Sequence, residues 1–178
     1  MLHTTFRRAK EANACQSSYR KMARALGGIT KYGWDIPIPL DKVLEVCGFE
    51  DALWSLRIIL EPADKEIRLL LCDYAESVLY LYEQSYPDDK RLRQVILVAR
   101  QFALGRATEQ ELTAAKVAAW TVIGTLTAAG WAIKAVAWTV IRTTVDAPRL
   151  AAGTTTLPVE RQKQILLFKK MLDGIKGG

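Results

Sequence analysis

The segment DKEIRLLLCDYAESVLYLYEQS, from Asp64 to Ser85, is the strongest indication of the architecture because it runs for about six helical turns without Gly or Pro. Apolar residues recur along it at the three- and four-residue steps of one helical face. They are Ile67, Leu71, Tyr74, Val78 and Leu81. Leu69, Leu70, Cys72 and Leu79 widen that face beyond the stripe of a surface helix. We therefore expect a long helix at the centre of the fold.

The residues that follow predict an antiparallel helical hairpin. Tyr86-Pro87-Asp88-Asp89 ends the first helix and offers a carboxylate as N-cap for a second one, where Leu92, Val95, Ala99 and Phe102 repeat at helical spacing. Gly105 is expected to end this second helix. Thr108 and Glu111 have the spacing of a capping box, which predicts that a third helix begins there.

A repeated motif dominates this third segment. AAWTVIG at Ala118–Gly124 returns as VAWTVIR at Val136–Arg142, an offset of 18 residues. Because a helix turns about 100° per residue, this offset equals five whole turns. One long helix rich in Ala and Trp, roughly 109–145, would present Trp120, Trp131 and Trp138 as a ridge, which we expect to be mostly buried against the hairpin.

The uncharged run from Val117 to Ile133 has to be weighed as a membrane span. Its 17 residues are at the lower limit for a spanning helix, and Thr and Gly dilute its apolar character. A buried bundle helix is the favoured interpretation, so we expect no membrane partner.

The flanking segments also predict helices. Thr5 to Leu26 reads as one helix ended by Gly27-Gly28, and YGWDIPIPL (Tyr32–Leu40) reads as a packed, extended connector because of its two prolines. Short helices are expected at 41–46, stopped near Gly48, and at 50–60. After a loop at 146–157, a last helix is expected from 158 to 172, stopped by Gly174. Taken together, these segments predict an all-α, single-domain bundle (1–178) of about six or seven helices.

The charges fall in three blocks within a formal net charge of +6. Residues 1–40 carry a net +5, residues 41–89 a net −8 and residues 90–178 a net +9. The blocks either neutralise one another when the helices pack, which we favour, or leave an acidic patch that faces a basic partner. Lys10, Arg20, Lys21 and Arg24 form a basic side of the first helix; without interleaved aromatic residues, a solvated face is favoured over nucleic-acid binding.

Several kinds of chemistry lack the residues that they need. His3 is the only histidine, so Ser-His, Cys-His and His-based zinc sites lack their central member. No GxxxxGK[ST], GxGxxG or HExxH motif occurs, and we expect no cofactor, metal or catalytic residue. Cys15, Cys47 and Cys72 form no CxxC pair, and the start of the chain has no apolar signal-peptide core, so we expect a cytoplasmic protein.

One constellation remains as a candidate site. Asp73, Glu76, Tyr80 and Glu83 lie at spacings of three and four, along one side of the predicted central helix. They either pair with Arg93 and Arg100 of the next helix, which we favour, or recognise a partner, or, as a third option, act in acid–base catalysis. Together with Asp88 and Asp89 they are our candidate partner-binding residues.

Three stretches resemble a family of bacterial immunity proteins that carry an immunity-five-like domain. They are AKEANACQSSYRKMARALGG (Ala9–Gly28) with YGWDIPIPL; CGFEDALWSLR (Cys47–Arg57); and RLLLCDYAESVLYLYEQSYPDDKRLRQVILVARQFALG (Arg68–Gly105). The third is the most specific. The resemblance covers about residues 9–112, and residues 113–178 share only the long helical character of that family's members.

This resemblance implies an all-helical, non-enzymatic protein that protects a producing cell from a toxin. The first hypothesis is thus an inhibitor that binds a toxin or effector protein stoichiometrically, through the acidic block or an exposed part of the tryptophan ridge. The alternative is a phage-encoded anti-defence protein that blocks a bacterial defence complex or sequesters a charged nucleotide signal. A third hypothesis, from another class, is a metal-independent enzyme that uses Asp73 and Glu76.

Overall fold

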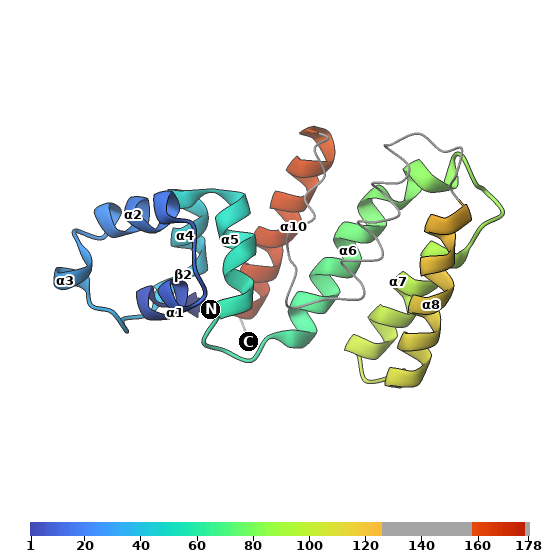
Figure 1. Cartoon of the computed structure of the whole chain (residues 1–178), viewed down its shortest axis with the longest axis horizontal. Coiled ribbons are helices and arrows are strands. Elements are labelled where there is room, and N and C mark those ends of the chain that lie inside the picture. Colours follow the sequence, from blue (N-terminus) through green and yellow to red (C-terminus); the bar gives the residue numbers. More distant parts are fainter. Residues whose placement is uncertain (126–157, 177–178) are drawn as a thin grey trace. The chain divides into compact units, whose positions relative to one another are not determined.

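A computed structural model of the chain describes residues 1–125 and 158–176. They divide into two compact units, Met1–Pro62 with Lys169–Gly178 and Ala63–Phe168, each of which is described by itself. The described residues are mostly helical (Figure 1), with a sheet of two-residue strands, so the all-α prediction is confirmed in outline. That all 178 residues form a single domain stays a prediction.

The N-terminal unit contains short helices around a small core. Strands β1 (His3–Thr4) and β2 (Ile38–Pro39) pair antiparallel, with Thr4 opposite Ile38. The helices are α1 (Phe6–Glu11), α2 (Gln16–Ala25), α3 (Ile29–Tyr32), α4 (Leu40–Cys47) and α5 (Phe49–Ser55), followed by a 3-10 turn at Leu56–Ile58. The ring of the buried Phe6 makes T-shaped contacts with the rings of Tyr19 and Tyr32, with ring centroids 5.4 and 6.0 Å apart. These contacts join α1 to α2 and α3.

The prediction of one helix from Thr5 to Leu26 is wrong, because the chain breaks between α1 and α2. Asn13 has a φ of 56°, a left-handed conformation that Asn tolerates better than most residues and that a helix cannot continue through. The predicted stop at Gly27-Gly28 is confirmed. Gly27 N–H donates to Arg24 O and Gly28 N–H donates to Ala23 O, the paired bonds of a Schellman motif.

Two further boundaries in this unit can be compared with the sequence. Gly48 has a φ of 96° and ends α4 as predicted, whereas the helix expected at 50–60 already ends at Ser55. The connector at 32–40 is extended at β2, but it is not packed throughout, because Trp34 and Ile36 are 40% and 50% exposed.

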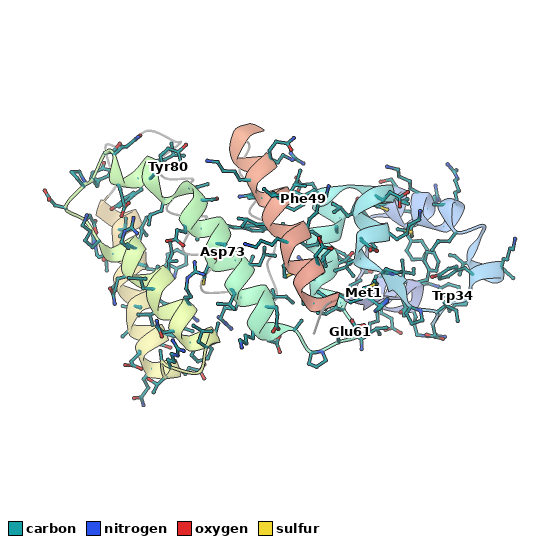
Figure 2. The ribbon with its side chains drawn as sticks, turned by 180° about the vertical axis from the view of Figure 1, so that it is seen from behind. Met1, Trp34, Phe49, Glu61, Asp73 and Tyr80 are labelled. Atoms are coloured by element: carbon teal, nitrogen blue, oxygen red, sulfur yellow. The ribbon has the colours of Figure 1, made fainter. Side chains whose placement is uncertain are left out.

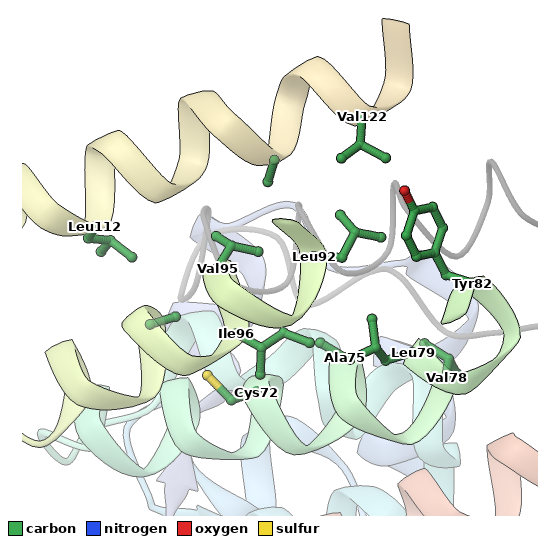
Figure 3. Packing of buried hydrophobic residues seen from close by; sticks show 12 residues of the cluster. Cys72, Ala75, Val78, Leu79, Tyr82, Leu92, Val95, Ile96, Leu112 and Val122 are labelled. Atoms are coloured by element: carbon green, nitrogen blue, oxygen red, sulfur yellow. The ribbon is translucent and has the colours of Figure 1, made fainter. Parts of the chain in front are cut away.

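The second unit holds the predicted hairpin and the start of the third helix. They are α6 (Asp64–Glu83), α7 (Arg91–Ala103) and α8 (Glu109–Thr125), with α7 in contact with both of the others. In Figure 3, Leu112 and Val122 of α8 point toward Val95 and Leu92 of α7. The far side of α7 packs on α6 through Ile96. The widened apolar face of α6 is buried as predicted at Leu70, Cys72 and Leu79.

The turn between α7 and α8 follows the two signals in the sequence. Gly105 has a φ of 69°, and the N–H groups of Gly105 and Arg106 donate to Phe102 O and Gln101 O, which ends α7. Thr108 N–H then donates to Glu111 Oε2 at 2.7 Å, and Glu111 N–H donates to Thr108 Oγ1 at 3.2 Å. The predicted capping box is confirmed.

The tryptophan ridge is only partly described. Helix α8 is described as far as Thr125, so Trp131, Trp138 and the rest of the helix expected at 109–145 lie outside the described residues. Trp120 is 40% exposed, and the burial prediction is wrong for this member of the ridge. The last helix, α10 (Pro158–Lys176), runs through Gly174, which does not stop it as predicted. A helix tolerates a single Gly at a cost of about 1 kcal/mol.

Candidate functional site

The predicted acidic residues on α6 are held by arginines of α7. Arg100 donates from Nη1 to Asp73 Oδ1 and from Nη2 to Glu76 Oε2, each at 2.7 Å. Asp73 lies on α6 in Figure 2, on the same element as Tyr80. One guanidinium therefore binds two carboxylates that follow each other at a three-residue step, and the cluster keeps a net charge of −1. The favoured interpretation, pairing across the hairpin, is confirmed for both.

Glu83 has the same kind of partner at the other end of the hairpin. Arg93 donates from Nε to Glu83 Oε1 at 2.6 Å and from Nη2 to Glu83 Oε2 at 2.5 Å, a bidentate pair. The hydrogen bonds from Arg93 hold the pKa of the Glu83 carboxyl below its usual value. A carboxylate that is held this way contributes little free negative charge to a partner surface.

Asp89 is the centre of a network that joins three segments. The buried Tyr82 hydroxyl of α6 donates to Asp89 Oδ2 at 2.7 Å, and Arg91 donates to the same carboxylate from its backbone N–H and its guanidinium. Arg91 Nη1 also reaches Thr121 Oγ1 of α8 at 2.7 Å. Hydrogen bonds from Arg91 and Tyr82 hold the pKa of Asp89 well below its usual range, against the effect of burial. The N-cap residue of α7 is Lys90, without a side-chain cap bond, so the predicted N-cap carboxylate is wrong in position: Asp89 lies one residue earlier and accepts from the Arg91 N–H at the start of the helix.

Three candidates keep more contact with solvent, and one of them is Glu76, whose side chain is 52% exposed although it pairs with Arg100. Asp88 is exposed beside this network. Tyr80 is 42% exposed, and the Lys163 ammonium lies 5.9 Å from its ring centroid. The six candidates therefore do not form one open acidic site. Asp73, Glu76, Glu83 and Asp89 pair with arginines of α7, and Glu76, Asp88 and Tyr80 are exposed to solvent.

The sequence analysis missed a groove in the N-terminal unit. Arg7, Lys10, Glu11 and Trp34 line an open groove of about 460 Å³, and the Lys10 ammonium lies 4.9 Å from the Trp34 ring centroid. Figure 2 places Trp34 at the α3 end of this unit. Lys10 and Trp34 are 24 positions apart in the sequence, so no local pattern could indicate that an aromatic residue joins the basic residues of α1.

A second, smaller cavity lies inside the N-terminal unit. It has a volume of about 50 Å³, and Tyr19, Met22, Cys47 and Trp54 are among its lining residues. The Tyr19 hydroxyl is buried and has no hydrogen-bond partner among the described residues. On the same scale, a cavity that binds benzene measures about 150 Å³, so this one is too small for an aromatic ligand.

Within 1–125 and 158–176, no group of three or more His, Cys, Asp or Glu side chains is placed to hold a metal ion. None of the helices in these ranges combines the length and the apolar character that crossing a membrane requires.

Residues 60–144 match the family model described as "Imm-5 like putative immunity protein". The resemblance stated from the sequence is therefore confirmed, with different bounds. The match contains the Arg68–Gly105 stretch and extends past residue 112, whereas the two earlier stretches lie before its start. It begins three positions before Ala63, where the second compact unit starts. Neither the curated proteins nor the solved structures contain a significant match to this chain.

Proposed function

Because residues 60–144 are an Imm-5 like domain, we propose that the protein is an immunity protein that binds a toxin or effector protein stoichiometrically and neutralises it without chemistry of its own. The observation that carries this proposal is the agreement between the match and the α6–α7–α8 unit. The charged residues that made the sequence recognisable are the residues that hold these helices together.

Such a unit suits binding better than catalysis. Arg91, Arg93 and Arg100 are engaged with carboxylates, so the carboxylates that an acid–base mechanism would use are ion-paired. A scaffold that is already rigid loses little conformational entropy when it binds, and this favours affinity. These ion pairs thus support an inhibitor that acts by binding its partner through a preorganised surface.

The second unit also exposes large apolar side chains that a partner can bury. They are Tyr80, Leu97, Leu104, Val117, Trp120 and Leu166. Tyr and Trp are enriched among the residues that dominate protein–protein binding, and exposed apolar side chains are the usual anchors of such surfaces. They support a protein partner.

The test is a growth rescue with a candidate toxin domain taken from the genes that flank this chain's gene. Cells that express that toxin domain should grow only when they also express this protein, and the two purified proteins should form a complex of fixed stoichiometry in isothermal titration calorimetry. Intact-mass spectrometry of the toxin after mixing should show no covalent change. Growth arrest despite full expression of this protein would contradict neutralisation, and a changed toxin mass would contradict a non-enzymatic mechanism.

A further inference from the structure

We propose that the protein binds a second copy of itself through the outer face of the α6–α7 hairpin and forms a two-fold symmetric dimer. The hairpin face consists of two exposed apolar residues and the ion-paired residues on either side of them: Tyr80, Leu97, Asp73, Glu76, Glu83, Arg93 and Arg100. The dimer would form without a toxin, so this inference goes beyond the proposed function and can fail without it.

On α6, Tyr80 lies between two of the carboxylates that pair with α7. It follows Glu76 by four residues and precedes Glu83 by three. Residues at these steps share one side of a helix, so the three residues belong to one face. The Tyr80 side chain is 42% exposed on this face, although the Lys163 ammonium lies 5.9 Å from its ring centroid.

On α7, Leu97 has the equivalent position between two arginines. It follows Arg93 by four residues and precedes Arg100 by three, and it is 46% exposed. Each of these arginines binds a carboxylate on one side of Tyr80, so the ion pairs bring Leu97 and Tyr80 to the same level of the antiparallel hairpin. One aromatic and one aliphatic side chain thus form an exposed apolar centre with an ion pair at either end.

The charges of the hairpin face cancel, but they are not mixed. The α6 edge carries three carboxylates and the Lys163 ammonium beside Tyr80, a net charge of −2. The α7 edge carries two guanidiniums, a net charge of +2. A face without net charge does not select a strongly acidic or a strongly basic partner.

A face with one acidic and one basic edge is complementary to itself. If a second copy is turned by 180° about an axis parallel to the hairpin, its acidic edge lies over the basic edge of the first copy, and the reverse holds at the other side. The same rotation brings Tyr80 of each copy over Leu97 of the other. The apolar centre is then covered and each charged edge meets its opposite, which is the arrangement of a specific interface.

The ion pairs retain groups that can bond across this axis. Arg93 binds Glu83 through Nε and Nη2, and Arg100 binds Glu76 Oε2 through Nη2. Among the described residues, Arg93 Nη1 and Glu76 Oε1 take part in no hydrogen bond, so a second copy can bind them without breaking the pairs within each hairpin.

Sedimentation velocity of the purified full-length protein over a range of concentrations is the first measurement. We expect a reversible equilibrium between monomer and dimer. Leu97→Glu should raise the dissociation constant at least about 30-fold, because it places one carboxylate from each copy in the apolar centre. The matched control is Ile36→Glu in the N-terminal unit, where the side chain is 50% exposed, and it should leave the dissociation constant unchanged. Circular dichroism melts check that both variants are folded.

A charge reversal on each edge is the second measurement. Arg93→Glu makes one level of the basic edge acidic, and Glu83→Arg makes the same level of the acidic edge basic. Each variant alone should associate at least about tenfold more weakly, because like charges then meet across the axis. An equal mixture of the two variants should form a heterodimer, because a wholly acidic level then meets a wholly basic one. A role of this ion pair only within the hairpin would not restore association on mixing.

Three results would overturn the inference. The first is a protein that stays monomeric up to its highest soluble concentration, or one that forms open-ended assemblies, because a two-fold face closes on one partner. The second is a dimer that persists in folded Leu97→Glu or is lost in Ile36→Glu, since the contact then lies elsewhere. The third is a mixture of Arg93→Glu and Glu83→Arg that associates no better than either variant alone. The growth rescue tests the proposed function separately from all three.

Discussion

Replacing Asp89 with alanine should remove the strongest single tie in the second unit. The change leaves the hydroxyl of the fully buried Tyr82 without an acceptor, which costs about 1–3 kcal/mol. It also frees the Arg91 N–H at the start of α7, worth about 1 kcal/mol, and breaks an ion pair worth up to about 1 kcal/mol. Since these losses overlap, we expect the free energy of unfolding to fall by about 3 kcal/mol.

The assay is urea unfolding followed by far-ultraviolet circular dichroism at pH 7, with Asp88→Ala as the matched control. Asp88 is the exposed neighbour, so its replacement should change stability by less than about 0.5 kcal/mol. In a Tyr82→Phe background the hydroxyl is gone, and Asp89→Ala should then cost about 1 kcal/mol less. Equal losses for the two aspartate variants, or no coupling to Tyr82, would refute the network as a source of stability.

The pH dependence follows from the sign of the pKa shift. The pKa of Asp89 is held below its unfolded value by Arg91, so its contribution is complete above that unfolded value, about 3.9, and is lost as the pH falls toward the folded value. The stability advantage of the unchanged protein over Asp89→Ala should therefore shrink between about pH 5 and pH 2. An advantage that stayed constant over this range would contradict the shift.

Three further outcomes are expected. Arg100→Met should lower the free energy of unfolding by about 1 kcal/mol and Arg93→Met, with one carboxylate partner, by about half as much; identical melting curves for both variants and the unchanged protein would contradict this. Tyr19→Phe should leave the thermal melting temperature unchanged or raise it, because the hydroxyl is buried without a partner; a clear fall would show that the hydroxyl is satisfied after all. Cys15 should react with a disulfide reagent at neutral pH long before Cys72, because the hydrogen bond from Ser17 lowers the thiol pKa of the exposed Cys15, while burial raises that of Cys72 to about 11; equal labelling rates by intact-mass spectrometry would contradict these environments.

The hairpin could be predicted from the sequence because its determinants are local. The apolar pattern of α6, the stop at Gly105 and the Thr108–Glu111 capping box each act within a few residues. The Asp73–Arg100 pair joins residues 27 positions apart. It could still be predicted, because a short turn between two antiparallel helices fixes which residues face each other.

The sequence-based predictions were wrong or incomplete where a single backbone angle or a contact between distant segments determines the local structure. The break after α1 depends on the positive φ of Asn13, and no Gly or Pro marks it in the sequence. Gly174 shows the reverse case, since a stop signal lies inside a helix that continues to Lys176. The groove at Trp34 depends on contact between α1 and a loop more than 20 residues later, and neither segment alone indicates it.

The arginines of the α6–α7 hairpin bind carboxylates of the same hairpin, so they offset most of its negative charge before any partner binds. Substitutions that spare Arg93 and Arg100 leave those pairs intact. Loss of Arg100 has the opposite effect, because Asp73 and Glu76 are then left without their shared cation. One substitution in the hairpin would thus change the net charge of this cluster from −1 to −2, and a basic protein would meet a more strongly anionic surface there.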